Sequence, residues 1–189
     1  VCPARRLRPV PRSAMSVEQH QSLPTVVVTG VAGSGKTTIG RSLADRLGVE
    51  FIDGDDFHGD TARQRMREGK PLTEFDRQQW LSRLVEGVAE RLPAVLACSA
   101  LRRHHRERLR ELPGARIVVL DVPEQELRRR LEARTGHFFP SSLLDSQLAT
   151  WEPPSESEPV TVVRGDRDAL VTVRCIADEL LLPDRRPAV

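Results

Sequence analysis

A glycine-rich segment with one lysine has the most readily assigned chemistry in this sequence. The pattern G-x-x-x-x-G-K-S/T is matched by Gly30-Val31-Ala32-Gly33-Ser34-Gly35-Lys36-Thr37. In such a loop, backbone N–H groups and the start of the following helix face phosphate oxygens, the lysine reaches the β- and γ-phosphates, and the last hydroxyl group binds Mg²⁺. The sequence therefore predicts a nucleoside triphosphate site, with Lys36 as a catalytic group and Thr37 as a metal ligand.

Three carboxylates crowd a second short segment, Asp53-Gly54-Asp55-Asp56. Like charges this close repel one another unless a cation or hydrogen bonds compensate them, and Mg²⁺ held by the phosphates would supply that charge. We expect Asp53 to face the metal. We expect Asp55 to face the substrate and to accept the proton of a hydroxyl group that attacks the γ-phosphate. The alternative is an acidic turn that caps the next helix.

Arginines gather at the end of a predicted helix that finishes near Ala133. Arg130 and Arg134 share one face of this helix because of their spacing. The glycine, proline and serines that follow predict a mobile lid at residues 134–151. We expect Arg130 and Arg134 to act as catalytic residues that close over the transferred phosphoryl group. A solvated basic helix end is the alternative interpretation.

A second basic run is Arg102-Arg103-His104-His105-Arg106. No Phe, Tyr or Trp interleaves it, so a solvated helix face is the default interpretation and nucleic-acid binding is not expected. Because the run follows a predicted strand, Arg102 or Arg103 is positioned to meet an anionic substrate. His104 and His105 lack a third ligand at metal spacing, and no metal site is predicted there.

Short apolar runs alternate with helical patterns, which predicts a parallel sheet with crossover helices. The expected strands are Thr25–Thr29, a short strand ending at Phe51-Ile52, Ala94–Cys98, Ile117–Leu120 and Val160–Val163. In open α/β sheets, ligands bind beyond the carboxyl ends of the strands. This rule brings the glycine-rich loop, the acidic segment, residues 99–103 and Asp121 to one edge of the sheet.

Three signals mark where helices begin or end: Gly48 as a C-cap, Thr73 as an N-cap and Pro123 in a first turn. Apolar residues at helical spacing define the faces that these helices bury. The residues are Ile39, Leu43 and Leu47; Trp80, Leu81, Leu84, Val85 and Val88; Leu127 and Leu131; and Leu170, Val173, Ile176, Ala177 and Leu180.

Composition indicates one ordinary domain. The chain has 189 residues, a net charge of +2 and three cysteines without C-x-x-C spacing. The near-neutral charge gives no reason to expect nucleic acid or membrane partners. No apolar run is as long as the roughly 18 residues that a membrane span requires. The cysteine pattern favours a reducing, cytoplasmic compartment. We expect a disordered tail at residues 1–22, a kinase domain at 23–183 and a short tail at 184–189. For residues 1–22, an arginine-rich transit peptide is the weaker alternative.

Read in order, several segments resemble the gluconokinase family. The most discriminating are Cys98-Ser99-Ala100-Leu101 and Arg134-Thr135-Gly136-His137-Phe138. The others are Gly30 to Thr38, Phe51-Ile52-Asp53-Gly54-Asp55, Gly69-Lys70-Pro71-Leu72-Thr73, Asp76-Arg77, Trp80-Leu81, Ser146-Gln147 and Glu152-Pro153-Pro154. The chain departs from the family pattern at Ala62, Arg65, Gln79, Arg102 and His105, where the family often has asparagine, lysine, proline, lysine and tyrosine.

The resemblance implies an α/β, three-layer P-loop kinase fold with a five-stranded parallel sheet, helices on both faces and a mobile lid. It implies ATP and Mg²⁺ as cofactors, D-gluconate as the substrate that is phosphorylated at its 6-hydroxyl, and often a homodimer. Another small-molecule kinase of this fold, or a non-catalytic ATP-binding regulatory module, is the alternative.

The resemblance and the chemistry of gluconate together nominate the site residues, since one carboxylate and several hydroxyl groups call for an arginine fork and polar groups. The ATP-binding residues are Gly30, Val31, Ala32, Gly33, Ser34, Gly35, Lys36, Thr37 and Thr38. The substrate-binding residues are Asp55, His58, Arg77, Ser99, Arg103, His137 and Gln147, with Arg77 on the gluconate carboxylate. Thr37 and Asp53 are the metal residues.

Overall fold

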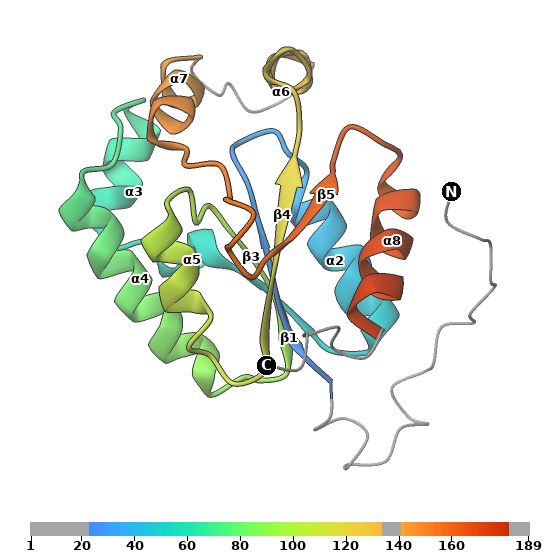
Figure 1. The fold of residues 1–189 in the computed structure, drawn as a ribbon. Coiled ribbons are helices and arrows are strands. Elements are labelled where there is room, and N and C mark those ends of the chain that lie inside the picture. The colour runs from blue at the N-terminus through green and yellow to red at the C-terminus, as the bar shows by residue number, and fades with distance from the viewer. Residues whose placement is uncertain (1–22, 134–140, 182–189) are drawn as a thin grey trace.

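A five-stranded parallel sheet organises the described part of the chain, which is residues 23–133 and 141–181 of the computed structural model (Figure 1). The strands are β1 (Thr25–Thr29), β2 (Glu50–Asp53), β3 (Ala94–Cys98), β4 (Ala115–Asp121) and β5 (Thr161–Arg164), in the spatial order β2-β3-β1-β4-β5. The helices are α2 (Lys36–Leu47), α3 (Asp60–Arg67), α4 (Glu74–Ala89), α5 (Arg103–Leu109), α6 (Glu124–Glu132), α7 (Ser141–Thr150) and α8 (Ala169–Leu181), with a short 3₁₀ turn, η2, at Gly54–Phe57.

The predicted fold class is confirmed, and so are all five strands. β1 and β3 have the predicted bounds, whereas β2 and β4 extend beyond them and β5 is shifted by one residue. The predicted tails at residues 1–22 and 184–189, and residues 134–140 of the predicted lid, lie outside the described residues.

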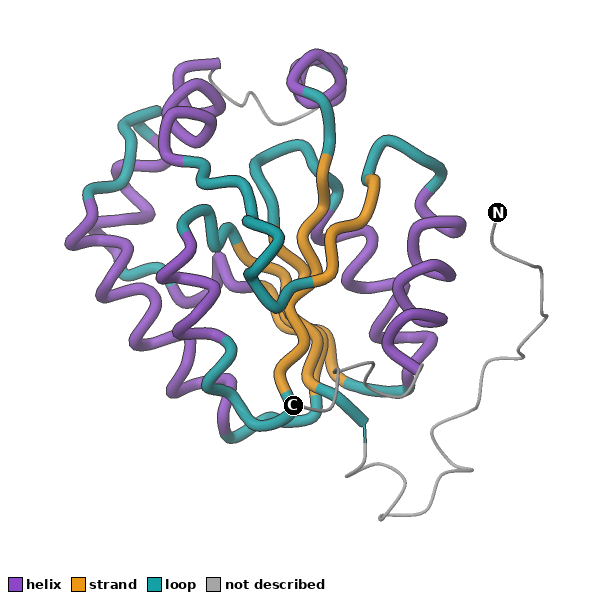
Figure 2. The backbone as a smooth tube through the Cα atoms, in the orientation of Figure 1, coloured by secondary structure: helices purple, strands orange, loops and turns teal. Residues whose placement is uncertain are grey.

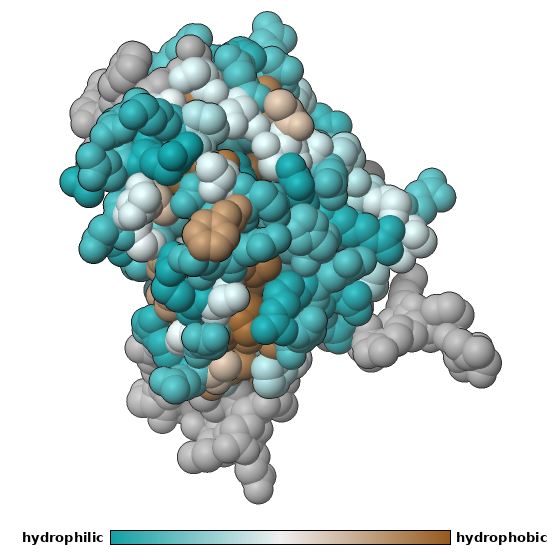
Figure 3. All heavy atoms as spheres, turned by 90° about the vertical axis from the view of Figure 1, so that its left-hand side faces the viewer, coloured by the Kyte–Doolittle hydropathy of each residue, from teal (hydrophilic) through white to brown (hydrophobic). Residues whose placement is uncertain are grey.

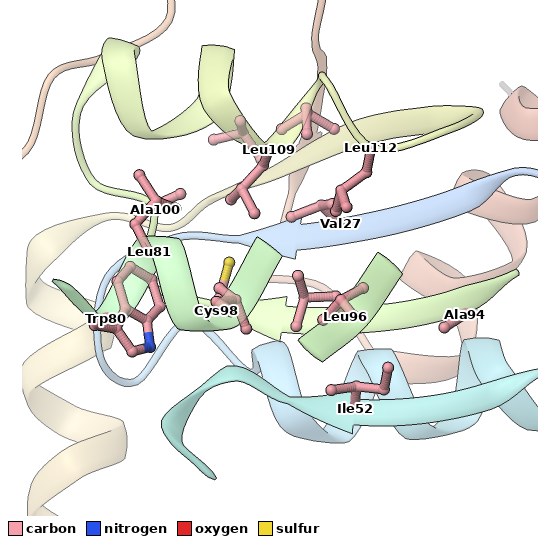
Figure 4. Close-up of a cluster of buried hydrophobic side chains, with 14 residues drawn as sticks. Val27, Ile52, Trp80, Leu81, Ala94, Leu96, Cys98, Ala100, Leu109 and Leu112 are labelled. Carbon is pink, nitrogen blue, oxygen red and sulfur yellow. The ribbon is translucent and has the colours of Figure 1, made fainter. Parts of the chain in front are cut away.

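Helices cover both faces of the sheet, so alternate strand residues enter two different cores (Figure 2). On one face, Val27 of β1 and Leu96 of β3 pack with Leu84 of α4 and Leu109 of α5; Figure 4 shows part of this cluster. On the other face, the neighbouring β1 residues Val26 and Val28 pack against α2 and α8. Because both faces of β1, β3 and the middle of β4 are buried, these strands read as continuous apolar runs instead of alternating ones.

The helix ends follow the predicted signals with one small difference. Gly48 takes a left-handed conformation at φ 69° and its N–H donates to the carbonyl oxygen of Ala44. Thr73 forms a capping box with Asp76 at the start of α4. Pro123 is the residue before α6 and not in its first turn. The proline thus stops the preceding extended segment just where the helix begins.

The surface offers few large apolar areas. In Figure 3 the visible face is mostly hydrophilic, and hydrophobic residues form only small areas on it. Among the described residues, the large hydrophobic side chains that are exposed are Phe75, Val162, Leu170 and Val171. No helix in the described ranges is both long and apolar enough to cross a membrane.

A buried ion pair ties the segment before β5 to α5. Arg106 and Glu158 are almost fully buried, and the guanidinium group donates to both carboxylate oxygens, at 2.5 and 2.8 Å. Arg106 also donates to the carbonyl oxygens of Ala100 and Leu101. These hydrogen bonds lower the pKa of the Glu158 carboxyl below its ordinary value of 4.5. The pair therefore fixes the connection that follows β3, where Ser99 enters the site.

We expect Glu158→Gln to lower the free energy of unfolding by about 3–5 kcal/mol at pH 7, because it leaves a buried guanidinium without its counter-charge. Chemical denaturation at several pH values measures this. Since the folded-state pKa of Glu158 is lowered, its contribution is present above pH 4.5 and is lost as the pH falls through the folded-state pKa, so the two proteins should converge in acid. Glu107→Gln, which breaks only an exposed pair with Arg103, should change stability by no more than about 1 kcal/mol.

Candidate active site

The glycine-rich loop connects the end of β1 to the first residue of α2. Gly33 and Gly35 adopt positive φ angles of 82° and 92°, which residues with side chains rarely adopt. A Cβ atom on Gly33 would also lie 3.1 Å from the carbonyl oxygen of Leu127. The loop therefore needs glycine at these positions, and it brings the N-terminus of α2, a favourable place for an anion, to the cleft.

Lys36 is the first residue of α2, and its side chain bends back over the loop. Its Nζ donates to the carbonyl oxygen of Val31 at 3.0 Å. Burial raises the pKa of the Asp53 carboxyl, and the positive charge of Lys36 opposes part of that rise. Lys36 is therefore held in the loop in a position from which it can turn to phosphate oxygens.

Two side chains from other helices make hydrogen bonds to the backbone of the loop. Gln147 of α7 accepts the backbone N–H of Ala32 at 2.7 Å. Arg130 of α6 donates to the carbonyl oxygen of Gly165 at 2.9 Å and lies 3.5 Å from those of Gly33 and Ser34. The structure thus places Arg130 against the outer carbonyls of the loop, paired with Glu126, and not among the residues that line the cleft.

A cleft opens from this loop toward α4 and α7. It is lined by Ala32, Gly33, Gly35, Lys36, Thr37, Thr38, Asp53, Asp55, His58, Met66, Lys70, Pro71, Leu72, Arg77, Trp80, Ala97, Ser99, Leu143, Ser146 and Gln147. The carboxyl ends of β1, β2 and β3 therefore meet at one site, as the strand-end rule predicts.

The acidic segment caps the η2 turn and also lines the cleft. Asp53 ends β2, and its Oδ1 accepts the N–H of Asp55 at 3.2 Å, which caps η2. Burial, followed by the charges of Asp55 and Asp56, raises the pKa of Asp53. Asp53 and Asp55 both line the cleft. A cation near them would relieve this repulsion.

Close packing positions this acidic turn. A Cβ atom on Gly54 would lie 2.6 Å from Cβ of Cys98, so only glycine fits between β2 and β3. The indole Nε1 of Trp80 donates to the carbonyl oxygen of Gly54 at 2.7 Å. Trp80, which the helical pattern assigned to the core, therefore also orients the two cleft carboxylates.

His58 lies between the acidic turn and α4. Its ring stacks on Trp80 with centroids 5.2 Å apart. Burial and the nearby charge of Arg77 lower its pKa to about 4, so the ring is neutral at pH 7. Its Nδ1 is buried and has no hydrogen-bond partner within the described ranges. A neutral ring with an unpaired nitrogen beside the cleft is suited to a substrate hydroxyl group.

Arg77 lies on the α4 wall of the cleft and is only 9% exposed. Burial lowers the pKa of its guanidinium group. Among residues 23–133 and 141–181, no carboxylate forms an ion pair with it, although Glu74 and Asp76 act on it at longer range. A buried guanidinium without a bound carboxylate is an energetically costly arrangement, which an anionic ligand in the cleft would offset.

Ser99 follows β3 and lines the cleft as predicted, whereas Arg103 does not reach it. The backbone N–H of Arg103 donates to Glu152, and its side chain donates to Glu107 on the surface of α5. The helix turns the Arg103 side chain outward, which its position after a strand did not reveal. Arg134 and His137 lie outside the described residues.

Sequence reasoning did not assign several cleft residues. Met66 comes from α3, Lys70, Pro71 and Leu72 come from the connection between α3 and α4, and Leu143 and Ser146 come from α7. Part of the family resemblance lies in the segment Gly69-Lys70-Pro71-Leu72-Thr73. This resemblance is the sequence signal that could have placed Lys70, Pro71 and Leu72 in the site. The packing of α3 and α4 beside the glycine-rich loop was not visible in any local pattern.

Known proteins combine the same features. A family model described as an AAA domain matches residues 26–154. A gluconokinase of Gluconobacter oxydans is 46% identical over 148 residues, which cover 75% of this chain and 83% of that protein. A crystal structure of a gluconokinase from Sinorhizobium meliloti superimposes with a TM-score of 0.77 at 41% identity, covering 83% and 91% of the two chains.

The chain belongs to the gluconokinase family. The thermosensitive gluconokinase of Escherichia coli is a further relative, 36% identical over 79% of this chain and 83% of that protein. A shikimate kinase from Bacteroides thetaiotaomicron, with 22% identity and a TM-score of 0.63, shares the fold alone. Membership in the gluconokinase family makes the protein a kinase. Kinases of this family use ATP, and the cleft beside the glycine-rich loop is the candidate site for it.

Proposed function

We propose that the protein transfers the γ-phosphoryl group of ATP to the 6-hydroxyl of D-gluconate, giving 6-phospho-D-gluconate and ADP. The observation that carries this proposal is Arg77, whose buried guanidinium lines the same cleft as the glycine-rich loop and has no ion-pair partner among the described residues. A sugar acid brings a carboxylate for Arg77 and hydroxyl groups for the polar walls. The gluconokinase relatives agree with this assignment.

At the nucleotide end, the loop would hold the phosphates of ATP. The α2 N-terminus and Lys36 offer positive charge to them. The residues also fit Mg²⁺, because the Thr37 hydroxyl and the Asp53 carboxylate both line the cleft and are oxygen ligands of the kind that Mg²⁺ prefers. When bound, Mg²⁺ neutralises phosphate charge; Thr37 would hold it and Asp53 would orient its ligands.

At the substrate end, Arg77 would bind the carboxylate of gluconate, and His58 and Ser99 would bind its hydroxyl groups. Asp55 lies in η2, directly after β2, and lines the same cleft as the loop and Arg77. It would accept or orient the proton of the attacking 6-hydroxyl. Catalysis would then rest mainly on positioning and on compensation of charge.

The remaining proposals concern the predicted lid, the loop contacts of Arg130 and Gln147, and the assembly. Arg134 and His137 would belong to a lid at residues 134–151, and Arg130 would act from behind the loop. Gln147 is proposed as a loop-orienting residue in addition to its predicted contact with substrate, because it binds the Ala32 N–H. We further propose a homodimer and a cytoplasmic location.

The test of the proposed function is release of ADP from ATP and Mg²⁺ with D-gluconate, shikimate and a panel of sugar acids and nucleotides. Turnover with gluconate alone is the expected result. Turnover with another acceptor only would retain the kinase and discard the gluconate site. ATP binding without turnover on any acceptor would favour a regulatory ATP-binding module.

Arg77→Ala is expected to raise the KM for gluconate by about 10- to 100-fold, since a charged hydrogen bond is worth about 1.5–3 kcal/mol. Initial rates at varied gluconate and saturating ATP measure this, and the KM for ATP should be unchanged. Arg91→Ala removes an arginine that pairs with Glu50 on the surface and serves as the control. An unchanged KM for gluconate in Arg77→Ala would remove Arg77 from the carboxylate site.

A further inference from the structure

Two adjacent histidines of α5 meet one carboxylate of α4 outside the cleft described above. Oε1 of Glu74 lies 3.2 Å from Nε2 of His104 and 3.5 Å from Nε2 of His105. All three ligand atoms lie within 4.8 Å of one another. Ligands bound at about 2.0–2.1 Å to a tetrahedral zinc ion are about 3.4 Å apart, so the two distances from Glu74 match that spacing and the two imidazole nitrogens lie within reach of the same ion.

The burial of this cluster points to a missing ligand. His105 is fully buried, and its Nε2 has no hydrogen-bond partner in the described part of the chain. The side chains of His104 and Glu74 are 50% and 36% exposed, so the cluster is open to solvent on one side. A buried nitrogen that makes no hydrogen bond among the described residues, but lies 3.5 Å from an accessible carboxylate and beside a second imidazole, is the arrangement that a metal ion would complete.

We propose that Glu74, His104 and His105 form a binding site for a divalent transition-metal ion of the zinc type. Two imidazoles and one carboxylate suit Zn²⁺, Co²⁺ or Ni²⁺, whereas Mg²⁺ prefers an all-oxygen shell. The fourth position is left to water on the exposed side. The site is therefore separate in both place and chemistry from the proposed Mg²⁺ site at Thr37 and Asp53.

Arg102 shapes the surroundings of this site. Its guanidinium contacts the other carboxylate oxygen of Glu74 at 3.3 Å, which leaves Oε1 for the metal and orients it. The backbone N–H of Arg102 lies 3.5 Å from Nδ1 of His105. Ligation through Nε2 places the ring proton on Nδ1, so this long contact is given up when a metal binds. The competing Arg102 contact with Glu74 and the lost contact at Nδ1 of His105 both make metal binding weaker than at a zinc site with four protein ligands.

A bound metal would connect the start of α4 to the start of α5. Glu74 is one helical turn before Arg77, and α5 directly follows the residues that carry Ser99 into the cleft. The ion would thus clamp the two elements that bear the proposed gluconate-binding groups. We expect the metal to raise the midpoint of thermal unfolding, since it binds only the folded arrangement.

The test is titration of the metal-free protein with Co²⁺ in excess Mg²⁺, without nucleotide or gluconate, so that its result is independent of the proposed function. We expect one equivalent to bind with a visible d–d absorption and no thiolate charge-transfer band, Zn²⁺ to displace it, and the unfolding midpoint to rise. His104→Ala and Glu74→Gln should each weaken binding by more than about tenfold.

Glu86→Gln, on the same helix α4 but away from the cluster, is the matched control and should bind Co²⁺ as the parent protein does. His104 is half-exposed, so its replacement by alanine removes a metal ligand without leaving a cavity in the hydrophobic core. Three results would overturn the proposal: no Co²⁺ binding, unchanged binding in His104→Ala, or a thiolate band that assigns the metal to a cysteine.

Discussion

Lys36→Met is expected to lower kcat by at least about 10³-fold, because the variant loses the positive charge that the loop directs at the transferred phosphoryl group. The side chain is already bent over the loop, with Nζ 3.0 Å from the carbonyl oxygen of Val31. It needs only to exchange this backbone partner for phosphate oxygens. Steady-state assays at saturating ATP and gluconate measure the loss, and ATP affinity should fall as well.

Arg41→Ala is the matched control for Lys36→Met. It removes a positive charge from the same helix, but its guanidinium stacks on Phe51 and lies away from the cleft. We expect its kcat to stay within about twofold of the parent, as for a surface change outside any special contact. A Lys36→Met protein that folds and retains most of its kcat would contradict the role assigned to the loop lysine.

Asp55→Asn should lower kcat by about 10²–10⁴-fold, the usual contribution of a general base, while ATP binding is spared. Asparagine keeps the size of the side chain and the η2 turn, but it cannot accept the hydroxyl proton. Trp80 and Gly54 hold the turn in place, so the change should remain local. Single-turnover phosphorylation of gluconate, with nucleotide binding measured separately, distinguishes chemistry from binding.

Asp56→Asn provides the comparison for Asp55→Asn. Asp56 is the adjacent carboxylate in the same turn, it is exposed, and it does not line the cleft. Both variants remove one negative charge beside Asp53, so a shared effect would report only on electrostatics. An Asp55→Asn enzyme with full activity, or equal losses in the two variants, would rule out Asp55 as the base.

Local patterns predicted the framework of the site well. The continuous apolar run of β1, the glycines of the loop and the four-residue repeat of α2 lie within one stretch of chain, and the structure confirms each of them. The Thr73 cap depends only on Asp76, three residues later. Such signals can be read because backbone geometry and hydrogen bonding between near neighbours decide them.

Contacts between distant segments could not be read in the same way. The sequence placed Arg103 at a strand end, but the start of α5 turns it toward Glu107 and Glu152. His104 and His105 showed no third ligand in their own segment, and Glu74 reaches them from 30 residues away. Helix orientation, set by the packing of α4 and α5 on the sheet, decides both outcomes.

By itself, the sequence determined the fold class, the phosphate-binding loop, the acidic strand end and the family. Only the tertiary structure decided that Arg77 is buried with no ion-paired carboxylate among residues 23–133 and 141–181, that Gln147 and Arg130 contact the loop, and that Glu158 neutralises Arg106. The physical reason is that the fold depends on short-range periodicity, which is written along the chain. The partner of a charged side chain depends on which helices pack together in space.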